Sequence, residues 1–326
     1  MTESLNVVDV INQSDLVDSI TGQKLGQPMI NLNLENDFGL TEFYVMPLFR
    51  ERTFASNTGR LSFPGIVNNP IYESSRKQQH IDLALRYSYS FDTWDLGFTV
   101  FHGTNREPYF AAEVSTPVET QINTVIDVVP YYAQMTQFGI DLQAFWGDWT
   151  WKLEAIRRES LVSHTAIVAG FEYPFVGVWG SDSEVTLFAE YLYDSRDPIG
   201  PVRISLDDTT QLLIFLSDTL FGGVLTPDFQ AEADARKLSP TITQNDIFSG
   251  IRWAFNDING TELRLGFLMD IEHISSYSTQ IEVTSRFSES LTWRVSGAFF
   301  NSEEKQDPLF NIKDDDYVEA GVKYYF

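Results

Sequence analysis

Cysteine is absent from the 326-residue sequence, which excludes a disulfide framework, a thiolate metal site and a cysteine nucleophile. Basic residues are scarce, with 22 Lys and Arg against 46 Asp and Glu. The net charge of −24 argues against binding to a nucleic-acid backbone. No window approaches the roughly 18 consecutive apolar residues that a membrane-spanning helix needs. The opening residues, MTESLNVVDV, lack the basic and apolar regions of a signal peptide.

Motifs of common enzyme classes are also missing. GxSxG, GxxxxGK[ST], GxGxxG and HExxH do not occur. The four histidines are scattered without metal-ligand spacing, at His80, His102, His164 and His273. Ser163 and His164 are adjacent, so a strand would point them to opposite faces. We therefore expect no catalytic residue, no cofactor and no metal site.

Aromatic residues are abundant, at 14% of the chain, and they often end stretches of about ten residues with period-two alternation. Strands of this length suit a tilted crossing of a bilayer better than a soluble sheet. The pattern predicts an all-β fold with thirteen strands, near 29–35, 40–49, 79–90, 94–103, 131–146, 149–159, 163–174, 184–194, 246–256, 261–270, 276–287, 291–301 and 316–326.

The connections between these segments alternate in length. Short, turn-like sequences such as GD at 147–148 and DING at 257–260 follow every second strand. The other set includes four long polar stretches, 50–78, 104–130, 195–245 and 302–315. Short turns on one side and long loops on the other are typical of an antiparallel, up-and-down transmembrane β-barrel with extracellular long loops.

Strand parity indicates that part of the barrel precedes this sequence. Bacterial single-chain barrels have an even number of strands with both ends in the periplasm, so thirteen strands imply that an odd number is missing upstream or miscounted. We expect an N-terminally truncated barrel that has about 14 to 18 strands when complete. Residues 29–326 would form the barrel, and residues 1–28 would be extracellular or inserted in the pore.

Alternate positions of the strongest strands form two different faces. The apolar face contains Ile81, Leu83, Leu85, Tyr87, Tyr89, Trp94, Leu96, Phe98, Val100, Leu263, Leu265, Phe267, Met269, Trp293, Val295 and Phe299. The other face contains the candidates for lining an aqueous lumen: Asp82, Arg86, Lys152, Glu154, Arg252, Glu262, Arg264, Glu282, Arg286, Arg294, Glu319 and Lys323.

Several of these features have two interpretations. The basic residues on the last five strands could set ion selectivity, or they could brace the wall through cross-strand ion pairs with Glu262, Glu282 and Glu319. Segment 195–245 could be an added hairpin above the membrane, a loop that constricts the lumen, or two further strands. The acidic loop 302–315 could bind divalent cations, although its spacing does not match an EF-hand and simple solvation is the favoured explanation.

The last strand, YVEAGVKYYF, resembles the closing strand of Gram-negative outer-membrane β-barrels. The stretches DVINQSDLVD (9–18), KLGQPMINL (24–32), RERTF (50–54), WKLEAIRR (151–158) and AFNDINGTELRLG (254–266) resemble an uncharacterised porin-like family of proteobacterial outer-membrane proteins. This resemblance implies location in the outer membrane and assembly by the barrel-assembly machinery. It also implies that a first set of strands precedes the 9–18 stretch, and it implies no particular substrate.

These observations lead to two functional hypotheses. The first is a porin-like channel for passive diffusion of small hydrophilic solutes through a charged lumen. The alternative is a non-conducting outer-membrane structural or interaction protein that binds lipopolysaccharide or a partner through its acidic loops. An open lumen favours the first, and a filled lumen favours the second.

Overall fold

Period-two alternation produces one 13-stranded antiparallel sheet, as the sequence predicts. The computed structural model describes residues 8–14, 24–54, 70–115, 125–196, 244–304 and 307–326. The strands of this sheet are β3 (Ile30–Asn36), β4 (Gly39–Met46), β6 (Asp82–Ser90), β7 (Trp94–Thr104), β10 (Gln134–Trp146), β11 (Trp149–Glu159), β12 (His164–Val176), β13 (Glu184–Asp194), β14 (Asn245–Ala254), β15 (Glu262–Asp270), β16 (Tyr277–Ser288), β17 (Leu291–Asn301) and β18 (Tyr317–Tyr324).

Each of these strands corresponds to one of the thirteen predicted segments, so the all-β prediction is confirmed. The other described elements are short: β1 (Gln13–Ser14), β2 (Lys24–Leu25), β5 (Ile71–Tyr72), β8 (Tyr109–Ser115), β9 (Val125–Tyr132), η1 (Lys77–Gln79), η2 (Val178–Gly180) and η3 (Pro308–Asn311). Within the described ranges, no helix is long and apolar enough to cross a membrane.

The sheet is open rather than closed. Its strands pair in the order β18-β17-β16-β15-β14-β13-β12-β11-β10-β7-β6-β4-β3, which leaves β3 and β18 at the two edges. Because the thirteen strands alternate in direction, these two edge strands run parallel to each other. They cannot join as an antiparallel pair, so the predicted closed barrel is not present in the described residues.

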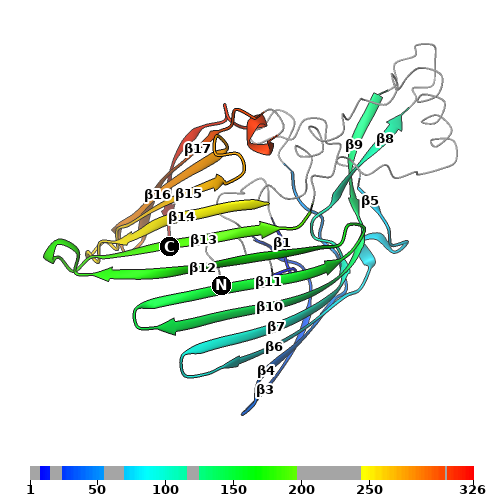
Figure 1. Ribbon diagram of the computed structural model, residues 1–326, viewed down its shortest axis with the longest axis horizontal. Helices are drawn as coiled ribbons and strands as arrows, with labels where there is room; N and C mark the ends of the chain where they lie inside the picture. Colours follow the sequence, from blue (N-terminus) through cyan, green and yellow to red (C-terminus); the bar gives the residue numbers. More distant parts are fainter. Residues whose placement is uncertain (1–7, 15–23, 55–69, 116–124, 197–243, 305–306) are drawn as a thin grey trace.

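Tight turns lie at one end of the sheet and longer links at the other (Figure 1). A two-residue turn joins β10 to β11 through residues 147–148, where Gly147 adopts a φ of 62° that favours glycine. The β3–β4 turn is held by Asn36, whose side-chain oxygen accepts a hydrogen bond from the Phe38 amide at 2.8 Å. The predicted alternation of short and long connections is therefore present.

One expected long loop contains strands, and two others lie partly outside the described residues. Segment 104–130 contains β8 and most of β9, which form a hairpin that projects beyond the loop end of the sheet (Figure 1). Strand β5 pairs with β9 in parallel. Residues 197–243, most of the 195–245 segment, and residues 55–69 within the 50–78 segment lie outside the described residues, so the alternatives for 195–245 stay open.

The buried apolar clusters of the described chain lie where residues 8–14 pack against one face of the sheet. Val10 contacts a cluster formed by Met46, Ala84, Phe101 and Met135. Val8 belongs to a second cluster with Ile156 and Ala166. These two clusters are therefore contacts between a short segment and a sheet face, rather than a layer between two sheets.

We predict that Gly250 is required for packing within the sheet. A Cβ atom at Gly250 would lie 2.2 Å from the Leu265 carbonyl oxygen and 2.5 Å from Cζ of Phe188, so backbone and ring would have to move. Gly250→Ala should lower the free energy of unfolding in urea by about 1–3 kcal/mol. Gly321→Ala is the control, because nothing lies within 4 Å of a Cβ there. Equal effects of the two substitutions would contradict this prediction.

Candidate functional site: the charged face of the sheet

Charge in the sheet is confined almost completely to one face. The register places the charged residues of the thirteen strands on the same side, except for Arg157 and Glu159 at the loop end of β11. All twelve predicted lumen-lining candidates lie on this charged face: Asp82, Arg86, Lys152, Glu154, Arg252, Glu262, Arg264, Glu282, Arg286, Arg294, Glu319 and Lys323.

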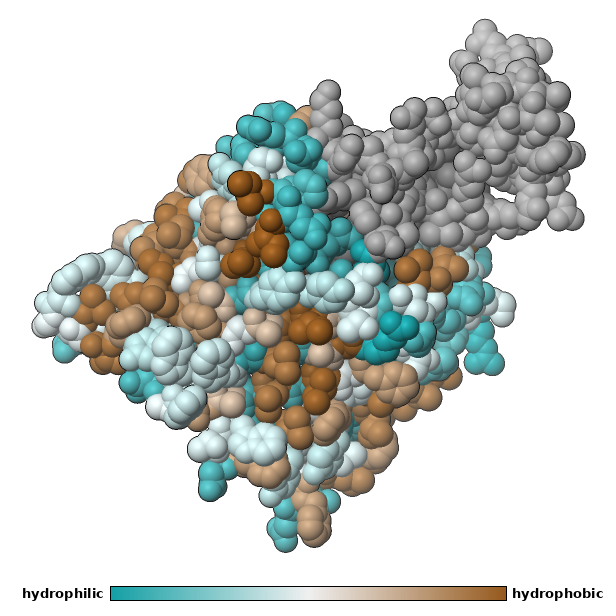
Figure 2. Space-filling model, viewed as in Figure 1, coloured by the Kyte–Doolittle hydropathy of each residue, from teal (hydrophilic) through white to brown (hydrophobic). Residues whose placement is uncertain are grey.

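The opposite face is apolar and exposed. Large side chains along it are about half exposed, for example Leu83 at 49%, Phe98 at 45% and Phe138 at 52%. Apolar residues are spread over the side of the sheet turned to the viewer in Figure 2. A soluble sheet would cover such a continuous apolar surface with a second layer, which the described residues do not provide.

Aromatic pairs recur at the turn end of neighbouring strands. Ring centroids are 4.0 Å apart in Phe91–Trp94, 5.8 Å in Trp149–Trp151, 4.8 Å in Tyr173–Phe175, 4.6 Å in Trp253–Phe255, 6.0 Å in Phe287–Trp293 and 6.4 Å in Tyr324–Phe326. The pairs form a belt of aromatic rings at one level of the sheet. Such a belt is typical of the interface between lipid and water.

Ion pairs in the middle of the charged face join adjacent strands or strands separated by one other strand. Arg86 on β6 donates two hydrogen bonds to Asp141 on β10, at 2.7 and 2.8 Å. The small residue Gly97 on the intervening β7 allows this contact, since a Cβ there would lie 2.3 Å from the Asp141 carboxylate. Lys152 on β11 pairs with Glu172 on β12. The wall is thus braced by cross-strand charges of opposite sign.

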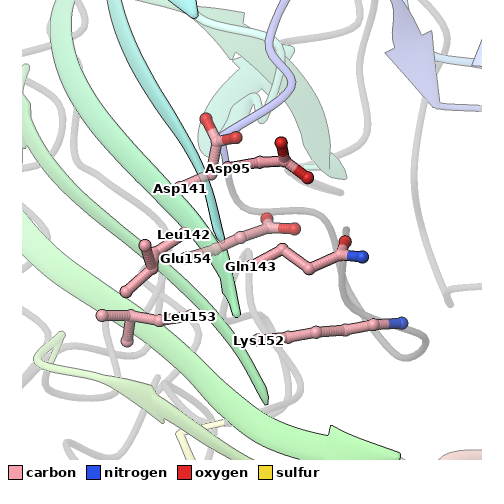
Figure 3. Close-up of a pocket in the computed structure, with 7 residues that line it drawn as sticks. All are labelled: Asp95, Asp141, Leu142, Gln143, Lys152, Leu153 and Glu154. Atoms are coloured by element: carbon pink, nitrogen blue, oxygen red, sulfur yellow. The ribbon is translucent and has the colours of Figure 1, made fainter. Parts of the chain in front are cut away.

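A small pocket of about 70 Å³ lies between β7, β10 and β11 (Figure 3). Its polar lining consists of Asp95, Asp141, Gln143, Lys152 and Glu154, which extend to the same side of the strands. Leu142 and Leu153 point the other way, as alternation requires. The pocket can take water or a small polar group. In the described ranges, no group of three or more His, Asp or Glu residues is arranged to hold a metal ion.

The basic residues near the C-terminus take part in bracing. Arg294 lies 3.6 Å from Glu282 on one side and 3.5 Å from Glu319 on the other, so one guanidinium bridges β16, β17 and β18. Arg264 lies 2.5 Å from Glu262 on its own strand. The cross-strand bracing interpretation is confirmed for Arg294, whereas the Arg264 pair lies within a single strand. A role in ion selectivity stays a prediction, because the two roles are compatible.

The loop end of the charged face carries the most deeply buried charges. Asp82, at 1% side-chain exposure, receives a 2.5 Å bond from Arg106 and lies 2.8 Å from His80. The Thr104 amide donates to the same carboxylate at 2.9 Å. Separating Arg106 from Asp82 would leave an uncompensated buried charge, which is energetically costly. These contacts therefore hold the first residues of the 105–108 link against β6.

The next residue of this link, Glu107, ties together two further strands. Its carboxylate lies 2.9 Å from the guanidinium of Arg158 on β11 and 2.9 Å from that of Arg196, which follows β13. Arg196 also pairs with Asp194 at 2.5 Å. Burial favours the neutral acid, but the positive charges of Arg158, Arg196 and Arg52 outweigh it and hold the pKa of Glu107 far below its usual range.

The sequence assigned the strand residues to the charged face but did not indicate the buried ion pairs around Asp82 and Glu107, which we call the clamp. The clamp residues Arg106, Glu107, Arg158 and Arg196 come from segments far apart in the chain, and all but Arg158 lie in connections that the alternation does not describe. Period-two patterns assign a face to a strand residue but assign no partner to a loop residue. No local signal could have identified these contacts.

We predict that Glu107 makes folding depend on pH. Its pKa is lower in the folded protein, so its stabilising contribution is complete above about pH 4.3, the ordinary carboxyl pKa, and is lost as the pH falls below that value. Glu107→Gln should cost roughly 2–3 kcal/mol near pH 7 because two arginines lose their carboxylate. Thermal unfolding between pH 3 and 7 should show a smaller acid-induced loss in the variant. Parallel curves would disprove this role.

No protein-family model matches the sequence, and no curated protein matches it significantly. The resemblance to porin-like outer-membrane proteins therefore stays a prediction. The function has to be argued from the two faces of the sheet.

Proposed function

We propose that this chain forms most of the wall of an outer-membrane β-barrel that lets small hydrophilic solutes diffuse through a charged, water-filled lumen. The observation that carries the proposal is the separation of charged and apolar residues onto opposite faces of thirteen consecutive strands. No chemical reaction is part of this function. The source would be a Gram-negative bacterium, and its barrel-assembly machinery would insert the protein.

Free energies of transfer into lipid support an orientation in which the charged face meets water and the apolar face meets lipid. An Arg or Lys facing lipid at the bilayer midplane costs roughly 2–4 kcal/mol, so a face with many charges has to meet water. The apolar face carries Arg157 and Glu159 only at its loop end, where their pair at 2.7 Å would lie in the headgroup region. The aromatic belt at the turn end would lie at the other interface.

Strand length supports the same arrangement. The ten consecutive strands from β6 through β17 in the large sheet have 9 to 13 residues each, which is enough for a tilted crossing. The edge strands expose unpaired backbone groups that lipid cannot satisfy. We infer that an odd number of further strands closes the sheet between β3 and β18, because only an odd number makes every pair antiparallel.

One observation favours the non-conducting alternative. Residues 8–14 and the link with Arg106 and Glu107 cover part of the charged face at its loop end. A protein whose lumen is filled in this way would serve as a structural element or would bind lipopolysaccharide or a partner through its loops. Conductance separates the two functions.

We expect the natural protein, purified in detergent and added to planar lipid bilayers, to produce discrete conductance steps. Vesicles that contain it should swell in solutions of small sugars, because solutes that fit the lumen enter with water. Heat-denatured protein is the control for detergent artefacts. Absence of both steps and swelling would refute the channel and leave the non-conducting alternative.

The lipid-facing assignment can be tested with neighbouring residues on β16. Ile281 is 39% exposed on the apolar face, whereas Gln280 lies on the charged face. Ile281→Arg should reduce the free energy of folding into vesicles by roughly 2–4 kcal/mol, and Gln280→Arg should have little effect. Urea titration of folding into lipid vesicles measures both. If Ile281→Arg and Gln280→Arg change the free energy of folding into vesicles by the same amount, the apolar face does not meet lipid.

A further inference from the structure

Residues 8–14 occupy an apolar patch on a face that is otherwise charged. Val10 is 3% exposed and contacts Met46, Phe101 and Met135, which extend from β4, β7 and β10. A wall that faces only water has no need for a Phe and two Met side chains side by side. Their presence is explained by the segment that covers them.

A second contact shows that the wall is shaped for this segment. Val8 is 5% exposed and packs with Ile156 and Ala166 from β11 and β12. On β10, a Cβ at Gly139 would lie 3.1 Å from a methyl group of Val8. Glycine therefore lets the segment approach the sheet closely, and a larger residue would push it away.

The backbone of the segment is held to the sheet by side chains rather than by pairing with the strands of the sheet. The carbonyl oxygen of Val8 accepts from Gln137 at 3.2 Å, and that of Val10 accepts from Arg106 at 2.9 Å. Gln27 donates to the Ile11 carbonyl at 2.6 Å. Among the described strands, β1 at the end of this segment pairs with β2 and is not part of the 13-stranded sheet.

We propose that residues 8–14 form a detachable plug, which narrows the channel at its loop end when Val8 and Val10 are seated in the apolar patch. This inference rests on the proposed channel function. Release breaks a few side-chain hydrogen bonds and exposes Val8, Val10 and the apolar patch beneath them, but it leaves every strand pair of the 13-stranded sheet intact. The plug can therefore leave and return without unfolding of the sheet.

Conductance of a double variant tests the plug. Val8→Asp with Val10→Asp should unseat the segment, because a carboxylate in an apolar contact is strongly disfavoured. Single-channel conductance should then rise on the order of twofold, as an open lumen conducts more than a constricted one. Leu161→Asp with Ile274→Asp is the matched control, since it adds the same charge at exposed positions in two loop-end links.

The outcomes separate the plug from the channel. A silent wild-type protein refutes the channel function itself. A conducting wild-type protein whose conductance is the same in the Val8 and Val10 double variant refutes the plug alone. A rise in both the double variant and its control also refutes the plug, because it would reflect only added charge near the pore.

Thiol labelling provides a test that does not rely on disrupted packing. The chain contains no cysteine, so Val10→Cys and Leu161→Cys each introduce a single thiol. A membrane-impermeant maleimide should label Leu161→Cys quickly and Val10→Cys slowly but completely, as the plug opens. Equal rates would show that the segment is not seated. No labelling of Val10→Cys, with normal labelling of Leu161→Cys, would show a permanent strap and overturn the proposed release.

Discussion

The structure depends on the alternation of side chains along a β-strand. Because neighbouring residues point to opposite faces, thirteen strands in register place nearly all their charged residues on one side and leave the other side apolar. A shift of one residue in any strand would move charges onto the apolar face. The register is therefore held by the energetic difference between water and an apolar environment.

The charged face is stabilised by pairing across strands rather than by burial in a core. Ion pairs join strands that are adjacent or separated by one strand. They are formed by Arg86 with Asp141, by Lys152 with Glu172, and by Arg294 with Glu282 and Glu319. Pairs in contact with water contribute little individually. The clamp around Asp82 and Glu107 differs, since loss of Asp82 would remove the carboxylate partner of buried Arg106, and loss of Glu107 would remove that of buried Arg158.

Residues 8–14 cover an apolar patch on a face that is otherwise polar. The lumen of the proposed channel would require a polar lining, yet Met46, Phe101 and Met135 form an apolar patch on the charged face. Covering that patch with Val10 removes it from water, and the covering segment stays separate from the sheet. In the proposed channel, the same contact that protects the patch would limit passage. Selective passage and a stable wall would then share the same residues.

The sequence by itself determined the thirteen strands, the two faces and the face of each charged strand residue, because period-two alternation is a local property of the chain. It did not determine the pairing of Glu107 with Arg158 and Arg196, or the docking of Val8 against Gly139. These contacts join residues that are far apart in sequence, and their geometry depends on how the sheet curves and where the links cross it. Only the tertiary structure could decide which charges are neutralised in buried pairs and which part of the charged face is covered.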